Sequence, residues 1–171
     1  MLFRSGEPPG ESPHPEPAKA LALSGNAAYF TEVTREFGLD GRAALLMAGT
    51  SHTVGIPYEA LLDIAKRADL ILNISGMLTD EALMERAGIR VYLDLDPAFN
   101  QLWDATQGVN MRFAGHTHFV TVGLEIGEPD CPVPTCGLSW IKTLQPVVLE
   151  RWPVGRQVVH DGLDRKSTRL N

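Results

Sequence analysis

The chain has 171 residues, of which 44% are hydrophobic, so it is long enough to form one domain with a buried core. Its net charge of −6 repels phosphate backbones, which excludes nucleic-acid binding as an expected function. No apolar run is long enough to cross a bilayer and no N-terminal segment has the form of a signal peptide, so we expect a cytoplasmic protein without a membrane span.

Both ends of the chain resemble translated sequencing adapters. Residues 1–5 read "MLFRS" and residues 164–171 read "DRKSTRLN", and each string matches one frame of a common adapter. We therefore expect the natural sequence to run from about residue 6 to residue 163, as an internal fragment of a longer chain. Processing scars are left out of fold prediction.

The first 25 residues are expected to form a flexible lead-in, because residues 6–20 are rich in Pro, Gly and Glu. Residues 26–153 are expected to form one α/β domain, followed by a tail over 154–171. The domain should open with a helix over 26–39, in which apolar residues recur at helical spacing and Gly38 ends the helix.

Short apolar runs then alternate with amphipathic segments. We predict strands over 43–48, 69–75, 89–96 and 118–123, and helices over 57–68, 79–88 and 97–106. Pro57 suits the first position of its helix, and Thr79 is the expected N-cap of the next one. This alternation predicts a Rossmann-like parallel sheet flanked by helices, with right-handed crossovers. A long Pro/Gly/Cys loop follows, and residues 146–153 are a possible fifth strand.

Two aspartates, Asp94 and Asp96, end the third predicted strand. Side chains two residues apart share a face of a strand, so the two carboxylates could hold one cation at the edge where parallel sheets bind ligands. The alternative is that Asp96 caps the helix beginning at Pro97, since Asp before Pro is a common helix start. We favour the cap for Asp96, and the role of Asp94 stays open.

Two histidines, His116 and His118, lie in the stretch "AGHTHF". Gly-His-Thr-His resembles the two-metal phosphoesterases of the calcineurin type. That family also needs Asp-x-His, Gly-Asp and Gly-Asn-His motifs earlier in the chain, and these do not occur here. We favour a pair of histidines at a strand start, one buried and hydrogen-bonded and the other facing the cleft.

Two glycine-bearing turns follow the first two predicted strands. The backbone of Gly49, Thr50 and Ser51, and that of Gly76, could hold an anion at a helix N-terminus, although neither turn has a Walker A or dinucleotide-binding pattern. Cys131 and Cys136 are predicted to be ordinary thiols, because no second cysteine pair exists to complete a zinc site.

Four phrases together resemble a group of bacterial glycosyltransferases: "ADLILNISGMLTDEAL", "RVYLDLDPAFNQLW", "MRFAGHTHFVTVGLEIG" and "PVPTCGLSWIKTLQPVVLERWP". The similarity covers residues 27–153 and is to the N-terminal half of the two-Rossmann GT-B architecture. It implies an acceptor-side domain whose nucleotide-sugar donor binds a missing C-terminal domain, so the chain alone should be inactive.

The resemblance also implies no Asp-x-Asp metal site and no resident cofactor. His116, His118 and Asp94 become the candidates for acceptor binding and for removing a proton from the acceptor hydroxyl. Two alternatives remain: a metal-dependent phosphoesterase that uses Asp94, Asp96, His116 and His118, and a non-catalytic α/β domain that binds a partner through residues 140–152.

Overall fold

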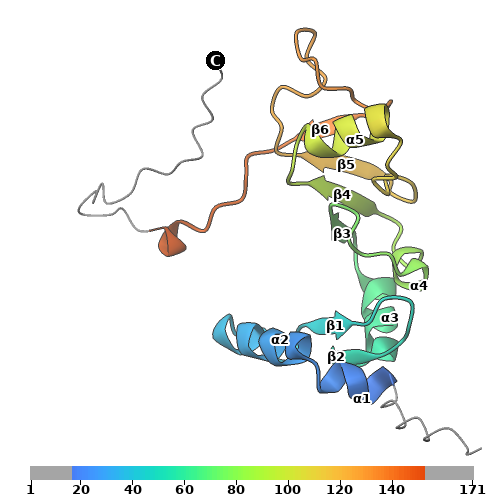
Figure 1. The fold of residues 1–171 in the computed structure, drawn as a ribbon, viewed down its shortest axis with the longest axis vertical. Coiled ribbons are helices and arrows are strands. Elements are labelled where there is room, and N and C mark those ends of the chain that lie inside the picture. The colour runs from blue at the N-terminus through green and yellow to red at the C-terminus, as the bar shows by residue number, and fades with distance from the viewer. Residues whose placement is uncertain (1–16, 153–171) are drawn as a thin grey trace, which may run out of the picture.

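The computed structural model describes residues 17–152. In chain order its elements are α1 (Pro17–Ala22), α2 (Gly25–Glu36), β1 (Ala44–Leu46), β2 (Thr53–Gly55), α3 (Tyr58–Arg67), β3 (Ile71–Ile74), α4 (Glu81–Met84), β4 (Arg90–Asp94), α5 (Phe99–Gln107), β5 (His118–Thr121), β6 (Trp140–Lys142) and the 3-10 turn η1 (Leu149–Arg151) (Figure 1). Within these residues no helix combines the length and the hydropathy that crossing a bilayer requires. The adapter-like strings at both ends lie outside the described residues.

The central element is a four-stranded sheet in the order β3-β4-β5-β6, in which every neighbouring pair is parallel. Helices α4 and α5 form the first two crossovers, and an irregular loop over 122–139 forms the third. The predicted α/β class with a Rossmann-like parallel sheet is therefore confirmed. Strands β3, β4 and β5 lie inside the predicted ranges, because each combines an apolar run with a neighbouring turn signal.

The two faces of the sheet are covered unequally. Asn73 and Tyr92 point to one face and are buried, with 2% and 0% of their surface exposed. On this face α4 places Met84 next to Asn73, while the backbone of Met111 accepts a hydrogen bond from Tyr92. Leu72 and Ile141, on the opposite face, are 51% and 54% exposed. The segments that make these contacts therefore lie on one side of the sheet. This is what right-handed crossovers require when the strands of a parallel sheet follow one another in chain order.

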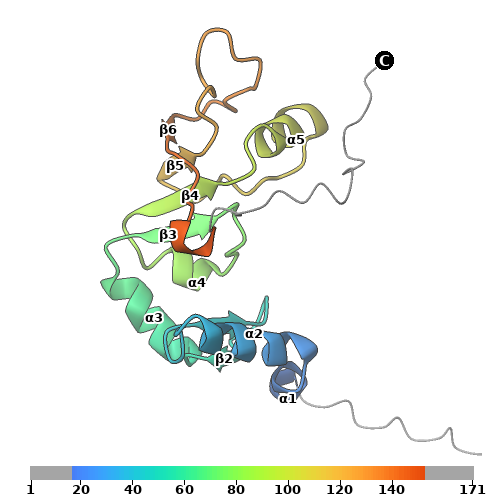
Figure 2. The ribbon, with the colours of Figure 1, turned by 90° about the vertical axis from the view of Figure 1, so that its left-hand side faces the viewer.

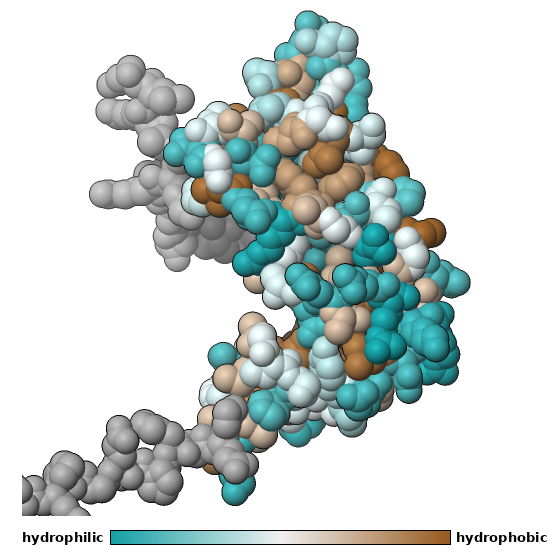
Figure 3. All heavy atoms as spheres, turned by 90° about the vertical axis from the view of Figure 1, so that its right-hand side faces the viewer, coloured by the Kyte–Doolittle hydropathy of each residue, from teal (hydrophilic) through white to brown (hydrophobic). Residues whose placement is uncertain are grey.

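The N-terminal elements form a separate group, and α3 connects them to the sheet (Figures 1 and 2). Helix α3 packs on α4 through a small core of Leu62, Ala65 and Leu83, which Leu46 of β1 also contacts. The space-filling view shows a notch between this group and the sheet, and more hydrophobic surface over the sheet and α5 than over the N-terminal group (Figure 3).

The prediction that residues 43–48 join the parallel sheet is wrong. β1 instead pairs antiparallel with β2, with Ala44 opposite Gly55, in a hairpin of its own. Gly55 has φ +94°, and a Cβ atom there would lie 2.3 Å from the carbonyl oxygen of Ala43, so only glycine allows the close approach of the two strands. The lead-in also contains more structure than its composition predicted, since α1 lies within residues 1–25.

Three further local predictions need correction. α5 begins at Phe99 rather than Pro97, and the backbone N–H of Ala98 donates to Gln101 Oε1 at 2.8 Å, so Asp96 is not the cap. Asp80, not Thr79, caps α4, because its carboxylate accepts from the Leu83 N–H at 2.9 Å. No strand forms over the described part of 146–153, where η1 lies. The sheet is extended by β6 instead.

Candidate functional site

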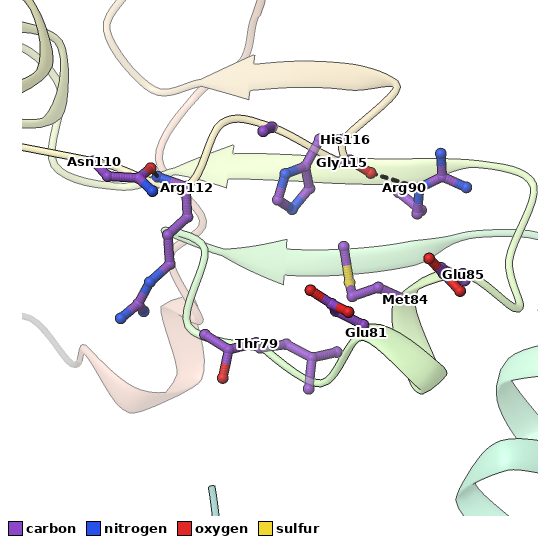
Figure 4. A pocket seen from close by; sticks show the side chains of 11 residues that line it. Thr79, Glu81, Met84, Glu85, Arg90, Asn110, Arg112, Gly115 and His116 are labelled. Atoms are coloured by element: carbon purple, nitrogen blue, oxygen red, sulfur yellow. Dashed lines mark hydrogen bonds between the residues drawn. The ribbon is translucent and has the colours of Figure 1, made fainter. Parts of the chain in front are cut away.

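A concave site that includes His116 lies over β3 and β4, between α4 and the segment 110–116 (Figure 4). We refer to it as the α4 pocket. Its volume is about 510 Å³. It is lined by Leu78, Thr79, Glu81, Met84, Glu85, Arg90, Asn110, Arg112, Ala114, Gly115 and His116. Volumes of this size are typical of pockets that bind small molecules.

Two carboxylates and two guanidinium groups line the pocket without forming ion pairs with one another. Glu81 is the first residue of α4 and Glu85 is its C-cap. Their side-chain oxygens have no hydrogen-bond partner within residues 17–152, and the ion pair found in this part of the chain joins Lys142 to Glu128 elsewhere. The guanidinium of Arg90 donates instead to the backbone carbonyls of Gly115 at 2.5 Å and Ala87 at 2.8 Å. All four side chains therefore remain able to bind a ligand.

Arg112 is held in a similar way at the other end of the pocket. Its Nη1 donates to the carbonyl of Gly76 at 3.3 Å, and its backbone N–H donates to the Asn110 side chain at 2.8 Å. Arg112 has φ +60°, a conformation that is unfavourable for a side chain of this size. The contact with the turn after β3 thus fixes the direction in which this guanidinium enters the pocket.

His116 lies half-buried in the wall of the pocket, where Asn73 holds its ring. Asn73 Oδ1 accepts from the backbone N–H of Leu78 at 2.8 Å, and Nδ2 donates to the Leu78 carbonyl at 2.9 Å and lies 3.0 Å from His116 Nε2. Because a backbone N–H can only donate, the amide orientation is fixed and His116 Nε2 must accept. Nδ1 then carries the proton and donates to the carbonyl of Phe113 at 3.2 Å. Both ring nitrogens are occupied within the protein.

Asp94 lies at the carboxyl end of β4 and is completely buried. Its carboxylate accepts from the side chains of Asn100 and Gln101 at 2.7 Å each, from Thr121 Oγ1 at 2.9 Å and from the backbone N–H of Asp96 at 3.1 Å. These bonds tie β4, β5 and the first turn of α5 together. Asp96 itself is exposed, so the two carboxylates do not face one another as a pair.

His118 lies on the other side of the sheet from His116. It opens β5 opposite Val91, whereas the His116 ring contacts Tyr92 with ring centres 5.1 Å apart. Neighbouring residues along a strand point to opposite faces, so His118 is on the open face. The structure therefore does not bring His116, His118 and Asp94 together. Within the described residues no three His, Cys, Asp or Glu side chains are grouped so that they could hold a metal ion.

The predicted anion-binding turns also lie apart. Gly49, Thr50 and Ser51 belong to the β1–β2 hairpin turn, where the Thr50 hydroxyl donates to the Met47 carbonyl at 2.9 Å. Strand β2 separates this turn from α3, so its amides do not form a helix N-terminus and that expectation is corrected. Gly76 is buried after β3 with φ +66°, and a Cβ atom there would lie 3.0 Å from Arg112 Cβ.

The two cysteines are free in the structure. Cys136 Sγ donates to the carbonyl of Gln101 at 3.4 Å, and burial, together with the nearby Asp104 carboxylate, raises the pKa of the Cys136 thiol. A raised pKa lowers the fraction of reactive thiolate, as expected for an ordinary structural thiol.

Residue patterns alone did not identify Asn73, Glu81, Glu85, Arg90 or Arg112 as site residues. Asn73 carries a usable signal, because a polar side chain within the apolar run "DLILNIS" must find hydrogen-bond partners when it is buried. No protein-family model, curated protein or solved structure matches the chain. The glycosyltransferase resemblance therefore remains a prediction.

Proposed function

We propose that this chain is the acceptor-side α/β part of a sugar transferase, which moves a sugar from a nucleotide-sugar to an acceptor hydroxyl. The observation that carries the proposal is the α4 pocket, a cavity with both charged and apolar side chains in its lining, on the covered face of a parallel sheet and with His116 in its wall. In this proposal the nucleotide-sugar binds a C-terminal domain outside the chain, and the acceptor lies in the α4 pocket.

The three candidate residues receive different roles in this proposal. His116 contacts the acceptor, but Nε2 would have to leave Asn73 before it could take a proton. Asp94 supports the site indirectly, by fixing α5 against β4 and β5. His118 remains outside the pocket, on the open face of the sheet.

The test begins with the source DNA, from which the reading frame is extended past residue 163 and expressed alongside the printed chain. Both proteins are incubated with UDP-glucose or GDP-mannose and a set of hydroxyl acceptors, and release of the nucleoside diphosphate is measured. We expect acceptor-dependent release by the extended protein and none by the printed chain. A source gene without a second domain, or phosphate-monoester hydrolysis that a chelator abolishes, would contradict the proposal.

A second candidate is a non-catalytic domain that binds a partner through residues 140–152. The observation that favours it is the exposure of large apolar side chains there: Leu144, Leu149 and Trp152 are 76%, 74% and 75% exposed. Trp140 is different, because it packs against Phe119 with ring centres 5.6 Å apart. The test is to measure sugar transfer by the extended protein with Leu149→Ser and Trp152→Ser. If transfer is unchanged, the segment 140–152 has no role in the sugar transfer of the first proposal.

A further inference from the structure

We infer that the α4 pocket binds an uncharged, polyhydroxylated ligand such as a sugar ring, with Glu81 and Glu85 as its hydrogen-bond acceptors and Arg90 and Arg112 as its donors. This inference rests on the proposed function and names the class of acceptor that the site takes.

The charges of the pocket favour an uncharged ligand. Glu81 and Glu85 can only accept hydrogen bonds, and Arg90 and Arg112 can only donate them. The four formal charges cancel, since two are negative and two positive. A ligand with a single charge would be attracted by one pair of side chains and repelled by the other. A hydroxyl group both donates and accepts, so it can bind to either pair.

The positions of these groups suit a ligand with hydroxyl groups around its rim. The two carboxylates come from α4 and its C-cap, whereas the guanidinium groups come from β4 and from the segment 110–116 (Figure 4). Backbone carbonyls hold both arginines, and the glutamates have no side-chain hydrogen bond within the described chain. A ring with hydroxyls around its rim can therefore contact both pairs at once, without first breaking an ion pair.

The apolar part of the lining suits the faces of a sugar ring. Leu78 and Met84 line the pocket, and His116 adds no free hydrogen-bonding nitrogen to it, because both of its ring nitrogens are bonded within the protein. A sugar ring has C–H groups on its faces and hydroxyls at its edges, which matches apolar contacts beside charged hydrogen-bonding groups. Pockets that bind small molecules generally combine these two kinds of lining.

The test measures binding to the ¹⁵N-labelled chain by NMR, with methyl β-glucopyranoside as the neutral probe. Glucosamine, glucuronate and serine are the cationic, anionic and zwitterionic probes. We expect methyl β-glucopyranoside to shift the amide signals of residues 78–86 and 110–117, and the other three probes to bind no more tightly. Tighter binding of a charged or zwitterionic probe, or no shift with methyl β-glucopyranoside, would overturn the inference.

The variants test the named acceptors. Glu81→Gln with Glu85→Gln keeps the shape of both side chains but removes their charge, so binding of the glycoside should weaken about tenfold, because charge-assisted hydrogen bonds are about twice as strong as neutral ones. The matched control is Glu59→Gln with Asp63→Asn, an exposed pair at the same spacing on α3, and it should leave binding unchanged. Equal effects of the two pairs would contradict the assignment.

The two proposals fail in different ways. Glycoside binding at these signals, without sugar transfer by the extended protein, would leave the pocket assignment standing and remove the transferase proposal. Transfer to a non-sugar alcohol, with no glycoside-induced shift, would do the reverse.

Discussion

The Asp94 carboxylate, at the end of β4, accepts hydrogen bonds from four donors and has no exposed surface. Asp94→Asn replaces one acceptor oxygen with an NH₂ group, which then faces a buried donor. Leaving buried polar groups unpaired in this way should lower the free energy of unfolding by about 3 kcal/mol. Urea denaturation measures this change.

Asp96→Asn is the matched control for that experiment, because the Asp96 side chain is exposed and only its backbone N–H binds Asp94. It should change the free energy of unfolding by less than about 0.5 kcal/mol. Similar losses in the two variants would mean that Asp94 does not organise this edge of the sheet.

The raised pKa of Tyr92 predicts that the fold loses stability at alkaline pH. Burial, followed by the nearby Asp94 carboxylate, raises the pKa of Tyr92 from 10.0 to about 12. Between these values the unfolded chain releases a proton that the folded chain keeps, so the free energy of unfolding should fall as the pH rises from 10.0 to about 12. Below pH 10.0 this contribution is constant.

Denaturation of Tyr92→Phe across this pH range provides the check. The variant should lose stability less steeply, although its stability below this range is lower because the hydroxyl no longer donates to the Met111 carbonyl. Tyr58→Phe is the comparison, since hydrogen bonding to Asp80 raises the pKa of Tyr58 as well. An unchanged slope in Tyr92→Phe would show that other groups cause the dependence.

At the scale of elements, the start of α5 contains backbone strain that a single substitution can relieve. Ala98 has φ +73° and ψ −40°, a conformation that costs a non-glycine residue about 1–3 kcal/mol. Ala98→Gly should therefore raise the free energy of unfolding by about 1 kcal/mol, because glycine adopts positive φ without a steric penalty. Thermal denaturation measures the gain.

The same substitution seven residues later has the opposite expected sign. Ala105 is exposed in the interior of α5, where glycine is about 1 kcal/mol less favourable than alanine. Ala105→Gly should therefore destabilise the fold. Two variants that changed stability in the same direction would contradict the strain assigned to Ala98.

The sequence patterns predicted those helices and strands that are determined by residues within or next to the element itself. Apolar runs fixed β3, β4 and β5, and Pro57 marked the start of α3. The run over 43–48 could equally join a parallel sheet or a hairpin, and the choice depends on the approach of Gly55 to Ala43, which is not visible in either segment alone. Strand β6 was missed because its three residues include Lys142 and form no apolar run.

The site was less predictable than the fold. His116 could be selected because of its motif, and the isolated polar position of Asn73 within β3 was a signal. Glu81 and Glu85 could be read only as acids in the first turns of a helix. Their role depends on the segment 110–116 crossing the sheet opposite α4, which no pattern within either segment specifies.

At the scale of the whole molecule, the N-terminal group and the sheet differ in how well they are packed. Between residues 18 and 56 the buried side chains are those of Ala27 and Thr34. The sheet and its covering elements bury many more, including Tyr92, Gln101 and Thr121, each with 0% exposure. Regions with few buried contacts open locally at a lower free energy than the core does.

We therefore expect native-state hydrogen exchange to separate the two groups. Amides of α2 and of the β1–β2 hairpin should exchange through openings of low free energy, and amides of β4 and β5 through global unfolding. Leu46→Ala, which removes a contact with the α3–α4 core, should speed exchange in the hairpin and leave β4 and β5 nearly unchanged. Val91→Ala, within the sheet, should instead lower the protection of β4 and β5. If Leu46→Ala reduced protection equally throughout the described chain, the two groups would unfold as one cooperative unit.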